Sequence, residues 1–94
     1  MIKINLVFPK AITRLTGNPY GREIFNKQVK DKINYSEKVE FVFPEQIIMI
    51  SSSFVQGFFD EMISTVGLVD VENMVSVVAA GLDVDKVIWD NLRF

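Results

Sequence analysis

The sequence predicts a single α/β domain with a mostly parallel or mixed sheet and helices packed against it, and two observations support this prediction. Short stretches rich in β-branched and aromatic residues alternate along the chain with longer stretches whose apolar residues recur at helical spacing. The chain has 94 residues, of which 49% are hydrophobic, which is enough for one core. We therefore expect one domain over residues 1–94, in the order β-α-β-α-β-α.

The first part of the chain predicts a strand, a loop and a helix. Apolar side chains occupy alternate positions in residues 2–8, which is the period of a half-buried strand. Residues 10–19 contain several turn-forming types and predict a loop. Asn18 followed by Pro19 is a helix start signal, with Asn18 as the cap, so a helix is expected over residues 19–34.

The second part of the chain predicts two further helices and the remaining strands. A strongly amphipathic helix is expected to open at the serines of residues 51–53, and Gly67 is well placed to end it. Asp83 is expected to cap the last helix. The strands expected here are short, apolar stretches: residues 39–43, 47–50 and 73–80.

Composition excludes several classes of function. The chain has no cysteine and no histidine, so it has no disulfide or thiolate metal site and lacks the commonest general base and metal ligand. We expect no catalytic residue, no metal and no cofactor, and a small enzyme ranks last among the functions considered. No apolar run reaches the roughly 18 residues of a membrane span, and the start does not resemble a signal peptide. A cytoplasmic protein without membrane contact is therefore expected.

Charge is distributed unevenly along the chain. Residues 1–38 carry eight basic and three acidic side chains, whereas residues 39–94 carry two basic and nine acidic ones. The asymmetry indicates either balance between neighbouring elements or a basic face for an anionic partner. Arg14 and Arg22 flank the turn of residues 16–21 and are the candidates for contacting an anionic group. Arginines interleaved with aromatic residues are absent, which argues against nucleic-acid binding.

Three consecutive serines, Ser51, Ser52 and Ser53, stand between a short apolar run and the amphipathic helix. A serine at this place caps a helix well, because its hydroxyl accepts a hydrogen bond from the open first turn. A nucleophilic serine would need a base, and the chain has no histidine to supply one. A phosphate would be stabilised at a helix start by free N–H groups and the positive end of the dipole. Capping and phosphorylation therefore both remain open for this stretch.

The segment FPEQIIMISSSFVQGFFDEM resembles the STAS-like domains of unknown function found in bacteria and phages, and the resemblance is best over residues 39–66. Those domains are similar to the STAS fold of anti-sigma factor antagonists. In the antagonists, the equivalent turn carries a serine that is phosphorylated by a histidine-kinase-type ATPase. On that turn, Ser52 takes the place of the phosphoacceptor, Ser51 that of an aspartate and Phe54 that of a glycine.

The resemblance implies a non-enzymatic regulatory module that binds a protein partner and is switched by phosphorylation of Ser52. The implied partner is a histidine-kinase-type ATPase, and the apolar composition would also suit a homodimer. The alternative is a phage- or defence-linked inhibitor that uses the fold as a rigid plug. The residues expected to contact a partner, besides Ser52, are Ser51, Ser53, Phe54, Gln56, Gly57, Arg14 and Arg22.

Overall fold

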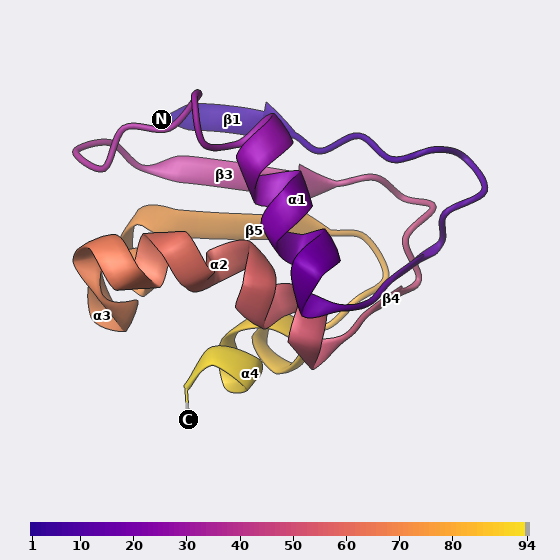
Figure 1. Cartoon of the computed structure of the whole chain (residues 1–94). Coiled ribbons are helices and arrows are strands. Elements are labelled where there is room, and N and C mark those ends of the chain that lie inside the picture. Colours follow the sequence, from indigo (N-terminus) through magenta and orange to yellow (C-terminus); the bar gives the residue numbers. More distant parts are fainter. Residues whose placement is uncertain (94) are drawn as a thin grey trace.

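Three parallel strands form the main sheet in the computed structural model, which describes residues 1–93 (Figure 1). Their order across the sheet is β1-β3-β5, and helical segments join each strand to the next. The predicted α/β fold with a mostly parallel sheet is confirmed. The elements are β1 (Ile2–Asn5), β2 (Arg14–Leu15), α1 (Asn18–Gln28), β3 (Val39–Phe43), β4 (Met49–Ile50), α2 (Ser52–Val66), α3 (Leu68–Met74), β5 (Val75–Ala79), the π-helical segment η1 (Asp85–Trp89) and α4 (Asp90–Leu92).

The two faces of the main sheet differ in their side chains. Ile4 of β1 lies beside Phe41 of β3, and both side chains are buried. Lys3 and Glu40 form the next aligned pair; Lys3 is exposed and Glu40 is half-buried. Because side chains alternate across a sheet, the first pair belongs to the face that α1 and α2 cover in Figure 1, and the second belongs to the opposite face.

Helices α1 and α2 pack closely against each other through two glycines. A Cβ atom added to Gly57 of α2 would overlap the backbone oxygen of Asn18, and one added to Gly21 of α1 would overlap that of Phe54. Both obstacles are backbone atoms, which cannot move aside as a flexible side chain can. The closeness of the two helices therefore depends on glycine at both positions.

Aromatic side chains dominate the core under these helices. The ring of Phe58, which is 0% exposed, lies with its centroid 5.2 Å from that of Phe41 and 5.0 Å from that of Phe59. Trp89 is also buried and packs against Phe59, with the ring centroids 5.7 Å apart. Trp89 is therefore a core residue. Phe94 lies outside the described residues.

Ion pairs from α1 and the turn that follows it to α2 account for part of the uneven charge distribution. Arg22 Nη2 lies 3.1 Å from Asp60 Oδ2, and Lys30 Nζ lies 3.3 Å from Glu61 Oε1. The basic first half of the chain thus faces acidic residues of the second half. All four side chains remain about half exposed, so these pairs add little to stability. They agree with the first of the two interpretations of the charge distribution, balance between neighbouring elements.

Helix α1 differs from its prediction at both ends. Its N-cap is Gly17 rather than Asn18, whose Oδ1 instead accepts a hydrogen bond from Arg22 Nε at 2.8 Å. The helix ends at Gln28 and not at residue 34, because the backbone of Val29, with φ −120°, leaves the helical conformation; its side chain is buried. The side chain of Gln28 donates to and accepts from the backbone of Val7, at 2.8 Å each, and so fixes the chain just after the end of β1.

The remaining differences involve short elements. The predicted loop contains β2, which pairs in parallel with β4 in a separate two-stranded sheet. Consequently the strand expected over residues 47–50 is shorter and does not join the main sheet. Helix α3 was not predicted; Gly67, with φ 86°, ends α2 and also caps α3. The strand expected over residues 73–80 therefore starts only at Val75.

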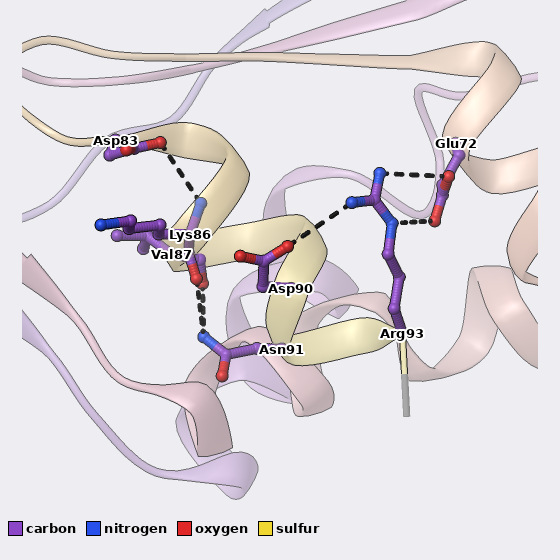
Figure 2. A network of polar contacts seen from close by, with 7 residues as sticks. All are labelled: Glu72, Asp83, Lys86, Val87, Asp90, Asn91 and Arg93. Carbon is purple, nitrogen blue, oxygen red and sulfur yellow. Dashed lines mark hydrogen bonds and ion pairs between the residues drawn. The ribbon is translucent and has the colours of Figure 1, made fainter.

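The last helical segment is wider than an α-helix at η1 (Figure 2). The backbone N–H of Asp90 donates to the carbonyl oxygen of Asp85, which is the spacing of a π-helix. The side-chain amide of Asn91 donates to the carbonyl oxygen of Val87 at 2.8 Å. This side chain therefore satisfies a carbonyl group within the widened turn.

Polar contacts hold this segment at both ends, as Figure 2 shows. Asp83 Oδ1 accepts from the backbone N–H of Lys86 at 3.3 Å, which confirms the predicted cap. Arg93 Nε donates to Glu72 Oε1 at 3.0 Å and so links the end of the chain to α3. This hydrogen bond raises the pKa of Arg93.

Candidate functional site

The three serines lie where the small β2–β4 sheet ends and α2 begins. Leu15 pairs with Ile50, and the backbone N–H of Ser51 donates to the carbonyl oxygen of Leu15 at 2.8 Å. The serines thus follow the carboxyl end of a parallel strand, as predicted, although that strand belongs to the small sheet. We call Ser51–Ser53 together with Gly17 the serine turn.

Ser51 is the N-cap of α2. Its backbone is extended, with φ −76° and ψ 157°, and its Oγ accepts from the backbone N–H of Phe54 at 3.2 Å. Its carbonyl oxygen accepts from the backbone N–H of Val55 at 3.1 Å. The prediction that one of the three serines caps this helix is confirmed for Ser51.

Ser53 joins the starts of the two main helices. Its Oγ accepts from the backbone N–H of Gly17 at 3.2 Å and lies 3.0 Å from Ser51 Oγ, with which it shares a hydrogen bond. Gly17 has φ 93°, a conformation that favours glycine. No local pattern in the sequence indicates this contact, because Gly17 and Ser53 are 36 positions apart.

Ser52 differs from its two neighbours. It is the first residue of α2, it is exposed, and its hydroxyl makes no hydrogen bond within residues 1–93. The first turn of α2 contains no acidic residue. The Ser52 hydroxyl is therefore the one that can react or bind without breaking a contact inside the serine turn.

Gln56 extends the exposed face that begins at Ser52. The two residues are four positions apart on α2, so their side chains lie on the same face of the helix. Gln56 is exposed and lines a cavity of about 200 Å³, whose other lining residues include Asp60, Asn91 and Leu92. The structure thus places the serine turn and this hollow along one side of α2.

Two residues expected to contact a partner are instead buried. Phe54 is 1% exposed, and its ring centroid lies 5.7 Å from that of Tyr20. Burial of the Tyr20 phenol raises its pKa, and the negative charge of Glu23 raises it further. Gly57 is buried against Asn18. The assignment of Phe54 and Gly57 to a partner surface is therefore corrected: both residues hold α1 and α2 together.

The two candidate arginines occupy different environments. Arg14 is exposed on β2, beside Met49 of β4, and makes no ion pair within the described residues. Arg22 contacts both Asp60 and Asn18. An anion would have to compete with Asp60 for Arg22, so Arg14 is the freer of the two candidates.

Replacing Ser51 with alanine is expected to lower the free energy of unfolding by about 1 kcal/mol, the usual cost of losing a helix cap. The substitution would also remove one of the two hydrogen-bond partners of the Ser53 hydroxyl, leaving the Gly17 N–H. Ser52→Ala is the matched control and should change stability by less than about 0.5 kcal/mol, as is usual for an exposed substitution. Urea denaturation followed by circular dichroism measures both. Equal losses for the two variants would contradict the assignment of the cap.

The described part of the chain offers no group of three or more acidic, histidine or cysteine residues suited to a metal ion. Within residues 1–93 no helix combines the length and the apolar character needed to cross a membrane. Comparisons with family models, curated proteins and solved structures find no match to this chain. Inferences about function therefore depend on the geometry of the serine turn and on the resemblance noted for residues 39–66.

Proposed function

We propose that the chain is a non-enzymatic, STAS-like regulatory module whose Ser52 receives a phosphate from a histidine-kinase-type ATPase partner. The observation that supports this proposal is the division of roles among the three serines. Ser51 caps α2 and Ser53 binds Gly17, whereas the Ser52 hydroxyl is exposed and makes no hydrogen bond within the described residues. Phosphate on Ser52 would leave both structural contacts in place.

The position of Ser52 also suits a negative charge. It begins a helix of 15 residues, whose first backbone N–H groups form the positive end of the helix dipole. A phosphoserine carries about −1.5 to −2 charge at neutral pH. With no acidic residue in the first turn, this charge would change the face shared by Ser52 and Gln56 from neutral to strongly negative. A partner bound to that face would respond to the change.

Ser52→Glu is expected to raise the free energy of unfolding by about 0.3–1 kcal/mol, because it places a carboxylate at the helix start. Ser64→Glu is the matched control: Ser64 is exposed on the same helix, close to its carboxyl end, where the same charge is unfavourable. Urea denaturation of both variants measures the difference. A shift of the same sign in both would contradict the dipole argument.

The regulatory proposal itself is tested with the wild-type protein and the Ser52→Ala, Ser52→Glu and Ser64→Glu variants. Each is used to capture partners from its natural source, and phosphate on the wild-type protein is mapped by mass spectrometry. We expect phosphate on Ser52 and an ATPase whose binding changes in Ser52→Glu but not in Ser64→Glu. Absence of phosphate from Ser52 would reject the switch. A partner that binds all variants equally would favour the alternative of a constitutive inhibitor.

A further inference from the structure

A second concave site lies at the opposite end of the main sheet from the serine turn. It is a cavity of about 240 Å³, formed where β3 and β5 begin and where α2 and α3 end. Val66 and Met74 supply apolar lining, and both side chains are half-buried. The residues that carry the argument are Tyr35, Lys38, Val66, Asp70, Asn73 and Met74.

Tyr35 lines this cavity, and its unsatisfied polar atom lies beneath the cavity surface. Its hydroxyl oxygen exposes less than 1 Å² and finds no hydrogen-bond partner in the described part of the chain. A buried hydroxyl without a partner lowers stability, because it has lost its hydrogen bonds to water. Native proteins satisfy nearly all such groups, and an exception calls for an explanation such as a ligand. Tyr35 is the only residue with such an atom within residues 1–93.

The rim of the cavity carries one basic side chain, Lys38, and two acidic ones, Glu37 and Asp70. Lys38, at the entry to β3, and Asp70, in the first turn of α3, form no ion pair with each other or with another described residue. Asn73 adds an amide one turn after Asp70. Lys38 and Asn73 can donate hydrogen bonds to a carboxylate, and Asp70 can accept them from an ammonium group. The rim therefore complements a molecule that carries both charges.

We propose that this cavity binds a free α-amino acid with an apolar side chain. The side chain would occupy the space beside Val66 and Met74, and the charged groups would meet Lys38 and Asp70. The volume fits this class, since an apolar cavity of about 150 Å³ already holds benzene, while sites for larger ligands usually exceed about 300 Å³. A local shift of residues 35–38 would let the ligand carboxylate accept the Tyr35 proton. The proposal does not depend on Ser52.

The test is a titration of the isotope-labelled full-length protein with L-leucine, followed by ¹H–¹⁵N NMR. We expect saturable shifts confined to residues 35–38 and 66–74. Two probes control for the charged groups: L-leucine amide lacks the carboxylate and 4-methylpentanoate lacks the ammonium group, and both should bind more weakly. The proposal would be overturned if L-leucine, L-methionine and L-phenylalanine all caused no shifts in those segments, or if either control probe bound as tightly as L-leucine.

Tyr35→Phe separates a binding role from a structural one. Removal of an unpaired buried hydroxyl should raise the midpoint of urea denaturation, while the loss of one hydrogen bond should weaken L-leucine binding about 3- to 10-fold. Ser64→Ala, at an exposed site away from the cavity, should change neither quantity. Unchanged affinity in Tyr35→Phe would overturn the role of this hydroxyl as a ligand contact, and a loss of stability would show that the hydroxyl already has a partner.

Discussion

Replacing Phe58 with alanine is expected to lower the free energy of unfolding by about 3–5 kcal/mol, the usual loss for a buried phenylalanine. Phe58 is 0% exposed, and its ring has aromatic neighbours on both layers of the fold. The cavity left behind would lie between α2 and the sheet, where the surrounding rings cannot all move inward. The free energy of unfolding of a whole protein is only about 5–15 kcal/mol. The variant should therefore be partly unfolded under mild conditions.

Urea denaturation, followed by circular dichroism and by the fluorescence of Trp89, measures this loss. Ile48→Ala is the control, because Ile48 is also a large apolar residue but is 58% exposed; its stability should change by less than about 0.5 kcal/mol. The stability loss in Phe58→Leu should lie between those of Phe58→Ala and Ile48→Ala, since leucine keeps more of the buried volume than alanine. A Phe58→Ala loss no greater than that of Ile48→Ala would show that Phe58 does not form the centre of the core.

Gly57→Ala is expected to lower the free energy of unfolding by about 1–3 kcal/mol, the usual cost of overpacking. This sign is opposite to the expectation from helix propensity, by which alanine should gain about 1 kcal/mol over glycine. Tertiary contact decides the result, because the added methyl group would overlap the backbone oxygen of Asn18 and α1 would have to move away.

Gln56→Ala is the matched control for this variant, because it lies next to Gly57 on α2 but is exposed. Its stability should be unchanged or slightly increased, since alanine favours the helix. Urea denaturation compares the two variants, and NMR of the Gly17 amide reports whether the hydrogen bond to Ser53 survives. A Gly57→Ala protein as stable as Gln56→Ala would contradict the close packing of α1 on α2.

The Gly57→Ala variant also bears on the serine turn. Ser53 binds Gly17 only because α1 starts beside the first turn of α2, and the glycine contacts set that distance. A shift of α1 should therefore weaken the Ser53 contact while leaving the Ser51 cap, which lies within α2 itself, in place. The exposed Ser52 needs neither contact, so its reactivity should survive best.

Features that depend on residues close together in the sequence were predicted well. The strand over Val39–Phe43, the span of α2 from the serines to Gly67 and the cap at Asp83 agree with the sequence-based expectations. Each depends on side-chain periodicity or on a cap that acts over three or four residues, and such interactions are visible in a linear sequence. Helix α3, a short element between a glycine and a strand, was missed because seven residues carry too little periodicity.

The amino-acid pattern was sufficient to indicate an α/β chain without histidine chemistry and a serine at the start of an amphipathic helix. Only the tertiary structure distinguished the three serines. The hydroxyl of Ser53 accepts a hydrogen bond from Gly17, which is 36 positions away, whereas that of Ser52 is exposed and makes no hydrogen bond within residues 1–93. It also showed that Phe54 and Gly57 are buried where α1 and α2 meet, and not exposed to a partner. The physical reason is that burial and long-range hydrogen bonds depend on which elements pack together, and local propensity does not encode that choice.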